Sequence, residues 1–557
     1  MTNKKKIAAA LLAVGLYLLL MEGLVAAESM GSDPSITGLG DAIWFSVVTL
    51  TTVGYGDMSP ATLPGRIIGI ILVLCSLGLL SFIITGMLAF LSGHTIPLLQ
   101  LRALSDRRWN IFLGRGREAC CLAGKLEAED PGCVSLFLTE EGEQTIRRED
   151  ARRFAVTADL LWLIGQKKRR DENADIRIFC LAADGWSNYS KAAARSRQLK
   201  QQKNICIYCR TAERAEQHDP GLVLFDYEDS LARDYWSRYP LHRGEQQILI
   251  IGSDGVGTRL LERALLTNVF EPDRRTDYLL AGDGRAFENS HYEFFNKAHL
   301  TIDADGQRVY VAGEEPYDRV TFCDRLTALR PQQILEADRI ILCSDRADDN
   351  RAVCHELRES YPLKGQIYLR QTGEDTAAGP QGVLLFGSDT EIFVPEMVMQ
   401  NKRNALAVSL NEAYRQTVRP EERASKAPDW ENLSEFKRQS NIAAADHLPV
   451  KARFLLGDEE ADRILREAAP GKEEEELFAA AYAIFLTCTE EEEKMDLLRH
   501  IEHNRWMRFH CLHNWRQGKR DNARRIHDLL IPHEQVPYEI QKYDDNAWAA
   551  LGEKLKN

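Results

Sequence analysis

The sequence lacks the features of two broad protein classes. Its 12 cysteines are scattered along 557 residues and none lies between residues 28 and 65, which favours reduced thiols over a disulfide framework. The net charge of −13 argues against broad nucleic-acid binding, because such binding requires clustered cations that replace phosphate counterions. We therefore expect neither a disulfide-stabilised secreted protein nor a nucleic-acid partner.

Motifs for catalysis are also missing. The chain contains no G-x-S-x-G, H-E-x-x-H or Walker motif, so we expect a protein that is not an enzyme. Cys206 and Cys209 have CxxC spacing, but they fall in an apolar run typical of a strand, where positions i and i+3 face opposite sides. We therefore favour core packing over a zinc or redox site for this pair.

Lysine and arginine are absent from residues 7–64. Residues 7–27, at the start of this range, are apolar apart from Glu22, and residues 67–91, which follow it, carry no charge. As helices, both segments are long enough to cross ~30 Å of hydrocarbon. Basic residues before the first segment and after the second predict, by the positive-inside rule, that both termini are cytoplasmic. We expect a multi-pass protein of the cell membrane, and a signal peptide at residues 7–27 is the alternative.

The length predicts three to four domains, at one per ~150 residues. From residue 109 onward, short β-rich runs alternate with polar helical stretches, which is typical of a parallel α/β sheet. The closing members of two successive series of runs resemble each other in order, and strand signals end after Pro395. The predicted strands are residues 109–114, 133–138, 159–165, 176–182, 204–209 and 221–226, then 246–252, 277–282, 299–304, 339–344, 366–371 and 383–388.

Between the two apolar segments lies the sequence DAIWFSVVTLTTVGYGDMSP. Its residues Thr52, Val53, Gly54, Tyr55 and Gly56 resemble the selectivity filter of potassium channels. The chemistry fits, because the carbonyls of the first four residues and the threonine hydroxyl can replace the water shell of K⁺. Carbonyls that point one way require φ > 0, which glycine adopts at little cost. The resemblance implies K⁺ bound at residues 52–55 and one quarter of a filter per chain, hence a homotetramer in a lipid bilayer.

The residues around this motif extend the resemblance. Residues 41–50 are expected to form a short helix whose C-terminal end directs partial negative charge at the ion path. The resemblance implies that Trp44 supports the filter and bonds to Asp57. Val48 stands where many such channels have a glutamate, so their inactivation behaviour is not implied here.

The second apolar segment would then line the pore. Gly78 and Gly86 are candidate bending points of this helix, because glycine inside a helix costs ~1 kcal/mol against alanine. Close packing between membrane helices is the alternative role for both glycines.

The expected fold is therefore an α-helical membrane pore, with two transmembrane helices and a re-entrant pore helix, followed by two α/β Rossmann-like domains and a mainly α C-terminal domain. The expected boundaries are residues 1–94 for the pore, 95–107 for a linker, 108–240 and 241–394 for the Rossmann-like domains, 395–432 for a helical linker and 433–557 for the C-terminal domain.

The paired Rossmann-like domains resemble the regulator-of-potassium-conductance (RCK) domains that form a gating ring in ligand-gated potassium channels. The first contains Gly114, Gly116 and Ala119 in the pattern G-x-G-x-x-A after a strand, and Glu140 follows the second strand as a candidate ribose partner. This is a candidate nucleotide site, and ring assembly without a ligand is the alternative. In the second domain Asp254 replaces the middle glycine, which disfavours a pyrophosphate there.

Calcium is a further alternative in the second domain, although no D-x-D-x-D-G loop occurs. Its candidate ligands are Asp254, Asp283, Asp303 and Asp305. Four histidines with helical spacing could form a metal cluster, for which the sequence offers few other ligands. They are His500, His503, His510 and His513.

The C-terminal segment carries a second resemblance, to the ryanodine-receptor repeat. LSEFKRQSNIAAADHL and HIEHNRWMRFHCLHNWRQGKRDNARRIHDLLIP support it. Tryptophan faces could stack a base, and arginines could bind phosphate, which would suit a nucleotide second messenger such as cyclic di-AMP. A purely structural role for these residues is the alternative. The candidate ligand-binding residues are Asn441, His447, Arg505, Trp506, Trp515 and Arg516.

The hypothesis from the sequence is a K⁺-selective channel whose pore is controlled by a cytoplasmic gating ring. The alternative is a membrane-anchored, NAD-dependent redox sensor or enzyme built on the first Rossmann-like domain. The gating ligand and the sign of its effect are left open.

Overall fold

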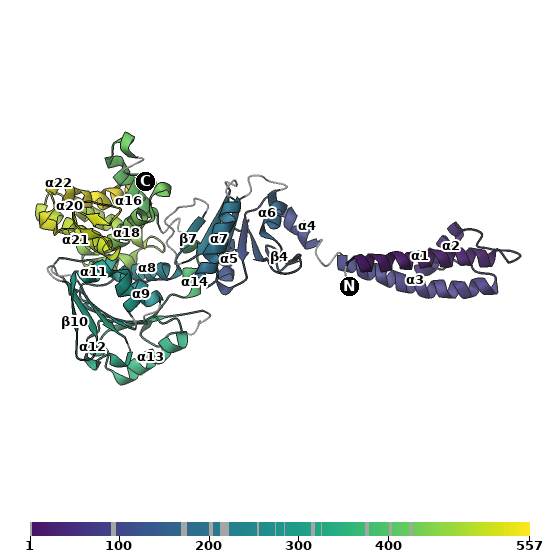
Figure 1. Cartoon of the computed structure of the whole chain (residues 1–557), viewed down its shortest axis with the longest axis horizontal. Helices are drawn as coiled ribbons and strands as arrows, with labels where there is room; N and C mark the ends of the chain where they lie inside the picture. The colour runs from purple at the N-terminus through teal and green to yellow at the C-terminus, as the bar shows by residue number, and fades with distance from the viewer. Residues whose placement is uncertain are drawn as a thin grey trace. The chain divides into compact units, whose positions relative to one another are not determined.

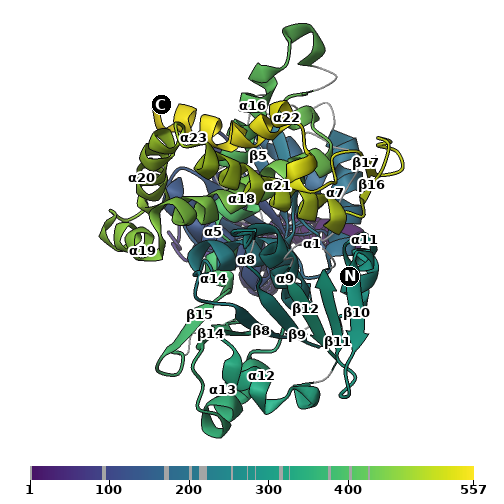
Figure 2. The same cartoon turned by 90° about the vertical axis from the view of Figure 1, so that its left-hand side faces the viewer.

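The computed structural model of the 557-residue chain divides into two compact units, which we describe separately. The first unit comprises residues 1–105 and 140–167, and the second comprises residues 106–139 and 168–557. Figures 1 and 2 show the elements of the chain from two sides. The structure describes residues 3–90, 96–168, 175–199, 204–211, 222–252, 255–272, 274–282, 284–312, 318–324, 326–373, 378–399, 404–423 and 427–556.

The first unit contains two long helices joined through a short one. Helices α1, α2 and α3 pack around a small core that includes Met21, Leu24, Ile36, Ala42 and Leu72. Strands β3 and β4 form an antiparallel hairpin between α4 and α6 in the chain order. The bounds are α1 Asn3–Glu28, α2 Leu39–Leu50, α3 Leu63–Phe90, α4 Ile96–Ala103, β3 Thr145–Arg148, β4 Arg153–Thr157 and α6 Leu160–Lys168.

Two expectations about this unit need comment. In the part of the chain that the structure describes, no helix has both the length and the hydropathy needed to span a membrane. The apolar segments 7–27 and 67–91 include residues whose side chains lie outside that part. The predicted strand at 159–165 is wrong, because residues 160–165 belong to helix α6. Asp159 accepts hydrogen bonds from the backbone amides of Leu161 and Trp162 at 2.9 and 3.1 Å, and this capping favours a helix.

In the second unit, five parallel strands follow the order β2-β1-β5-β6-β7. The order places β1 beside both β2 and β5, as in doubly wound α/β folds. Cys206 and Cys209 lie in β6, where Cys209 is buried and Cys206 half-buried, so the prediction of core packing is confirmed. The elements are β1 Trp109–Leu113, α5 Arg117–Glu129, β2 Val134–Thr139, β5 Ile176–Cys180, α7 Gly185–Leu199, β6 Ile205–Arg210, β7 Leu222–Phe225 and α8 Tyr227–Arg238.

A second, mixed sheet has eight strands in the order β10-β11-β12-β9-β8-β13-β14-β15. Strands β10, β11 and β12 pair antiparallel at one edge, and the other pairs are parallel. All six strands predicted here are present, and β11 and β12 were not predicted. The elements are β8 Gln247–Ile251, α9 Gly255–Thr267, β9 Asp277–Ala281, α10 Arg285–Ser290, α11 Tyr292–Asn296, β10 Ala298–Ile302, β11 Arg308–Ala312, β12 Arg319–Cys323, α12 Pro331–Glu336, β13 Arg339–Leu342, α13 Ala347–Ser360, β14 Gln366–Arg370, β15 Val383–Phe386, α14 Asp389–Ile392 and α15 Pro395–Val398.

The remainder of the chain is mainly helical, as predicted. A two-stranded ladder interrupts the helices after α21. The predicted domain boundaries stay predictions. The bounds are α16 Ala405–Thr417, α18 Glu435–Leu456, α19 Asp458–Glu467, α20 Glu473–Cys488, α21 Glu492–Leu512, β16 Arg516–Gln517, β17 Ile526–His527, α22 Tyr538–Gln541 and α23 Asn546–Lys556.

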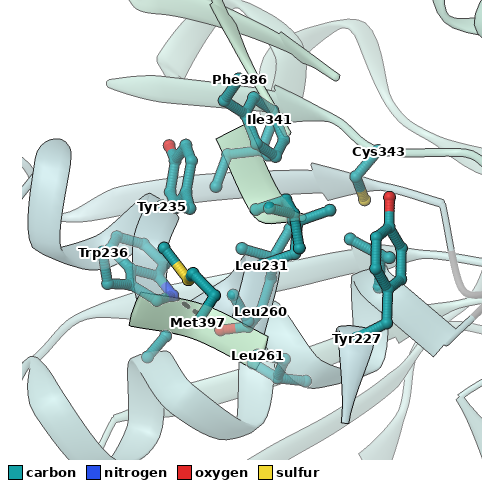
Figure 3. Close-up of a cluster of buried hydrophobic side chains, with 14 of the residues drawn as sticks. Tyr227, Leu231, Tyr235, Trp236, Leu260, Leu261, Ile341, Cys343, Phe386 and Met397 are labelled. Carbon is teal, nitrogen blue, oxygen red and sulfur yellow. Dashed lines mark hydrogen bonds between the residues drawn. The ribbon is translucent and has the colours of Figure 1, made fainter. Parts of the chain in front are cut away.

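Helices α8 and α9 form the centre of the second unit. Figure 3 shows Leu231 and Trp236 of α8 packed with Leu260 of α9, and the Trp236 indole N–H donates to the Leu260 carbonyl at 2.9 Å. The same buried cluster contains Val450 of α18 and Phe509 of α21. One continuous core therefore joins both sheets to the C-terminal helices.

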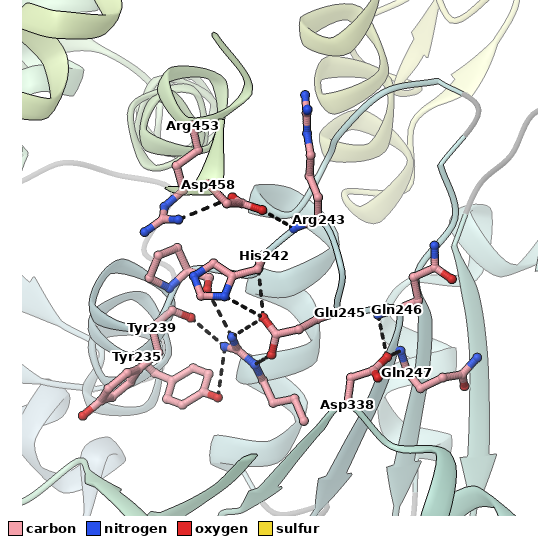
Figure 4. A network of polar contacts seen from close by, with 12 residues as sticks. Tyr235, Tyr239, His242, Arg243, Glu245, Gln246, Gln247, Asp338, Arg453 and Asp458 are labelled. Carbon is pink, nitrogen blue, oxygen red and sulfur yellow. Dashed lines mark hydrogen bonds and ion pairs between the residues drawn. The ribbon is translucent and has the colours of Figure 1, made fainter. Parts of the chain in front are cut away.

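The segment that connects the two sheets is also fixed by polar contacts (Figure 4). Arg339 is 1% exposed and donates to both carboxylate oxygens of Glu245 at 2.8 and 2.7 Å, and to the Tyr239 carbonyl at 2.6 Å. The backbone amide of Arg243 donates to Asp458 at the start of α19 at 2.8 Å. Because a buried ion pair is costly to break, this connection holds one conformation.

Candidate functional site

The predicted filter residues have an alternating backbone. Thr52, Gly54 and Gly56 have φ of 59°, 56° and 75°, while Val53 and Tyr55 between them do not have positive φ. In an ordinary strand successive carbonyls alternate in direction, whereas alternation with left-handed residues can turn them to one side. Thr52 pays ~1–2 kcal/mol for this conformation, and such strain is typical of functional segments.

Helix α2 holds the start of this segment. The backbone amides of Val53 and Gly54 both donate to the carbonyl of Val48, at 3.0 and 3.2 Å. At the other end of α2, Asp41 accepts hydrogen bonds from the Thr37 amide and hydroxyl at 2.9 and 2.8 Å. Helix α2 therefore accepts hydrogen bonds from the amides of the filter segment, and the carbonyls of that segment remain available.

The contact that the resemblance implied beside the filter is present. The indole N–H of Trp44 donates to an Asp57 oxygen at 3.0 Å. The Trp44 ring lies nearly parallel to that of Tyr55, with centroids 6.2 Å apart. Val48 is buried. The role of these residues in conduction stays a prediction, and the surroundings of Gly78 and Gly86 lie outside the described residues.

A buried carboxylate that sequence reasoning missed joins α1 to α3. Glu28 is fully buried and accepts hydrogen bonds from the amides of Ala61 and Thr62, both at 2.9 Å, and from the Thr62 hydroxyl at 2.8 Å. A Cβ at Gly65 would overlap Glu28 Oε1. Glu28 thus supplies the first turn of α3 with an anionic cap. An isolated acid at the end of an apolar segment was the only available signal.

The first glycine-rich turn has the expected local geometry. Gly114 has φ of 106° at the end of β1, Gly116 precedes α5, and Ala119 is buried. Arg117, the first residue of α5, lies 3.6 Å from the carboxylate of Asp389 in α14. Burial raises the pKa of the Asp389 carboxyl, and the charge of Arg117 opposes that rise.

Glu140, the candidate ribose partner, is exposed and belongs to the first unit. Nucleotide binding by Glu140 and the glycine-rich turn stays a prediction.

The second glycine-rich turn is closely packed. A Cβ at Gly257 would overlap the Gly252 carbonyl oxygen, and one at Gly252 would lie 2.8 Å from the amide of Ser344. Asp254 and Asp283 lie outside the described residues. Among the residues described, no group of three or more His, Cys, Asp and Glu side chains is arranged for a metal ion.

Asp303 and Asp305 both pair with Arg330, and Asp305 does so at 2.6 Å. Of the four predicted metal-site histidines, His503 uses Nε2 on the Ile531 carbonyl and His513 uses Nδ1 on the Phe509 carbonyl, both at 2.8 Å.

A cavity of about 1640 Å³ in the second unit brings together four of the six predicted ligand-binding residues. Asn441 of α18, Arg505 and Trp506 of α21, and Trp515 line it. Two predicted residues lie elsewhere. His447 is fully buried with Nε2 2.8 Å from the Val269 carbonyl, and Arg516 is exposed in β16.

The floor of this cavity carries a buried ionic cluster. Glu502 accepts hydrogen bonds from Lys451 at 2.9 Å and from Arg505 Nε and Nη2 at 3.0 and 2.6 Å. Burial alone would raise the pKa of Glu502, but the charges of Arg505 and Lys451 outweigh it and hold the pKa well below its usual range. Arg505 is 2% exposed, and its Nη1 has no hydrogen-bond partner among the described residues.

Aromatic rings form another wall. Trp506 contacts the rings of His510 and His527, with centroids 4.0 and 5.0 Å apart, and Trp515 stacks on Phe436 at 5.1 Å. Burial lowers the pKa of His510 to about 3, so its ring is neutral. Its Nδ1 donates to the Trp506 carbonyl at 2.9 Å, which leaves Nε2 as an acceptor. The cavity thus offers flat faces, a neutral acceptor and an arginine donor.

Comparisons with known proteins bear on the first unit. Residues 11–93 match the sequence profile of a family described as "Ion channel", and ion channels are not enzymes. Human "voltage-gated potassium channel regulatory subunit KCNG1" is 33% identical over 73 residues, 13% of this chain and 14% of that protein. A "voltage-gated potassium channel" of Aeropyrum pernix is 50% identical over 54 residues, 9% of this chain and 18% of that protein. The chain therefore matches less than a fifth of the length of either relative.

Two solved structures are similar at low scores. "Crystal structure of the GsuK bound to ADP" has a TM-score of 0.36 and 16% identity, and it covers 70% of this chain and 96% of that one. "GsuK channel bound to NAD" has a TM-score of 0.38 and 14% identity, with 73% and 86% covered. At these scores the likeness supports no conclusion about ligands of this chain.

Proposed function

We propose that the chain is the subunit of a K⁺-selective channel, in which residues 52–56 of four copies form the selectivity filter of a homotetramer. The observation that carries the proposal is the alternation of left-handed residues at Thr52, Gly54 and Gly56, with only one non-glycine among them. Carbonyls turned to one side by this backbone supply the oxygens that replace the water of a K⁺ ion.

Features around the filter support a site completed by other copies. Val53 and Tyr55 are 52% and 67% exposed in the single chain, and Trp44 is 45% exposed. Large apolar and aromatic side chains at these positions are unusual for a free surface and typical of an interface. The proposed location of this pore is the cell membrane, with both termini in the cytoplasm, and the apolar segments on either side of the filter support it.

Control of the pore is assigned to the second unit. A nucleotide second messenger, with cyclic di-AMP as first candidate, binds in the cavity lined by Trp506, Trp515, Arg505 and Asn441. The indole faces stack a base and arginine donors bind phosphate. The ligand acts on the pore only through a difference in affinity between the closed and open states.

The test is ion flux from liposomes that contain the full-length chain, with K⁺ and Na⁺ compared in the presence and absence of cyclic di-AMP. We expect K⁺ flux above Na⁺ flux, and a change in K⁺ flux on addition of ligand. Equal flux of both ions would reject the filter assignment. Absence of any K⁺ flux together with turnover of NADH would favour the membrane-anchored redox protein, for which the Gly114 turn is the one supporting feature.

A further inference from the structure

The cavity is built by two parts of the second unit and not by the C-terminal helices alone. Helix α9, which follows the first strand of the second sheet, contributes Gly255, Thr258, Arg259 and Glu262 to its lining. On the aromatic side the lining comes from α18, α21 and the segment after it. A ligand in this cavity would therefore touch a helix that belongs to the α/β core.

Arg259 is the cation that α9 presents to the cavity. It donates to Glu262 at 2.5 Å and to Asp226 at 3.2 Å. Asp226 is the N-cap of α8 and accepts a hydrogen bond from the Asp229 amide at 3.0 Å. Arg259 thus lines the cavity and also contacts the N-cap residue of α8.

Arg259 stabilises the ionised form of Asp226, which burial and neighbouring carboxylates disfavour. Burial raises its pKa to about 6, the nearby charges of Asp229 and Glu228 act in the same direction, and Arg259 opposes them. Glu262 also faces Arg259. Removing Arg259 from this group would leave Asp226 and Glu262 without the cation they contact, so Asp226 would take up a proton more readily.

Further ion pairs join α9 to α8 and α8 to α18. Arg263 of α9 donates to both oxygens of Asp229 at 2.6 and 2.7 Å. Arg233 of α8 donates to both oxygens of Asp446 in α18 at 2.7 and 2.8 Å. Because α18 also lines the cavity, α8, α9 and α18 meet in one cluster of charges next to it.

A buried donor on Arg505, which also lines the cavity, favours an anionic or acceptor-rich ligand. Arg505 Nη1 is buried and has no hydrogen-bond partner among the described residues. A buried donor without a hydrogen-bond partner is destabilising. A ligand that accepts a hydrogen bond there would remove this cost.

We propose that Arg259 is the anion-binding residue of the cavity, and that a phosphate group of the ligand displaces Asp226 from Arg259 while the aromatic wall holds the base. This inference rests on the proposed ligand control and adds the residue through which the ligand acts on α8. Displacement transfers the guanidinium from an internal carboxylate to the ligand, and Asp226 takes a proton from solvent. The ligand class is therefore an aromatic base that carries phosphate.

Calorimetry on the full-length protein in lipid nanodiscs tests the proposal, with cyclic di-AMP and ATP as probes. Arg259→Gln should weaken binding by at least ~10-fold, the loss expected for a charge-assisted hydrogen bond. Asp226→Asn keeps the helix cap but removes the competing charge, so it should tighten binding. Arg346→Gln is the matched control, because Arg346 is exposed and does not line the cavity. Titrations of the wild type in buffers of different ionisation enthalpy, at a pH above 6, should show proton uptake on ligand binding, because loss of the Arg259 contact raises the pKa of Asp226 further.

The outcomes separate this inference from the proposed function. If the wild type binds a probe and Arg259→Gln binds it equally well, Arg259 is not the anion site, although ligand control stands. Weaker binding by Asp226→Asn would equally contradict the displacement. If the wild type binds neither probe, the inference and the proposed ligand control both fail. K⁺ flux by the same preparation then tests the pore on its own.

Discussion

The proposed filter segment and the proposed ligand cavity of the second unit are sites of opposite kinds. The proposed filter spans five consecutive residues and uses backbone carbonyls, so side chains matter mainly through the φ angles they permit. The cavity is lined by side chains from positions as far apart as Glu228 and Ala547. A site made of consecutive backbone can be recognised in a sequence, whereas a site made of distant side chains becomes visible only when the chain has folded.

The largest effect is expected at the filter. Gly54→Ala and Gly56→Ala each add a Cβ at positive φ, at a cost of ~1–2 kcal/mol per subunit, and should abolish K⁺ selectivity. There is space for the Cβ in both cases, so the effect is conformational. Gly40→Ala is the control, since Gly40 lies in α2 without positive φ and also has open space around it. The measurement is K⁺ against Na⁺ flux, and retained selectivity in either variant would reject the assigned backbone role.

A smaller but graded effect is expected at the cavity. Trp506→Ala removes a stacking face, and loss of base stacking costs ~1–3 kcal/mol, so the affinity for cyclic di-AMP should fall ~5–150-fold. Trp430→Ala is the control, because Trp430 packs against a different cluster and does not line the cavity. Calorimetry on the full-length protein measures both. Equal affinity in wild type and Trp506→Ala would show that Trp506 has only a structural role.

The buried histidines beside the cavity predict a pH dependence of stability. Burial lowers the pKa of His447 and of His503 to about 4, and that of His510 to about 3, from 6.5. The unfolded chain binds these protons more readily than the folded chain. The contribution of the histidines to the free energy of unfolding is therefore complete above pH 6.5, and it falls as the pH decreases towards 4. Each histidine contributes a slope of ~1.4 kcal/mol per pH unit in this window.

Denaturant unfolding between pH 7.5 and 5 measures that slope. Asp544, whose pKa burial raises, titrates in the opposite sense, so the comparison that counts is wild type against His510→Gln. The variant should lose less stability on acidification than the wild type does. An identical pH dependence of the two would show that His510 is not buried and neutral.

The smallest effect is expected at Arg516, in β16. Arg516 was predicted to bind ligand as one of the arginines that could bind phosphate, but it is exposed and lies outside the cavity lining. Arg516→Gln should therefore leave the affinity for cyclic di-AMP within twofold of the wild type. A loss as large as that of Trp506→Ala would mean that the cavity is not the ligand site.

The same contrast explains which parts of the fold could be predicted. Strands such as Gln247–Ile251 are buried on both faces and read as continuous apolar runs. Strands β11 and β12 were missed because Arg308–Ala312 and Arg319–Cys323 begin with arginine and lie at the antiparallel edge of the sheet. Residues 159–165 were assigned to a strand because a short apolar run does not distinguish a strand from a helix.

The residues of the candidate site also divide into those that could be predicted from the sequence and those that could not. Trp506 and Trp515 could be named from the sequence because aromatic residues near arginines suggest base and phosphate binding. Arg259 could not, because it lies some 250 residues earlier in the chain and only the packing of α9 against α18 and α21 brings it to the cavity. Glu28 was missed for the same reason, since its partners Ala61 and Thr62 lie more than 30 positions away.

The central claim is selective conduction of K⁺ by the segment from Thr52 to Gly56. Its most direct test is the reversal potential of the full-length wild-type protein in a planar bilayer, with K⁺ on one side and Na⁺ on the other and cyclic di-AMP present on both. We expect a reversal potential that is shifted strongly in the direction set by K⁺ permeation. A reversal potential near zero, in a preparation that does carry current, would contradict it.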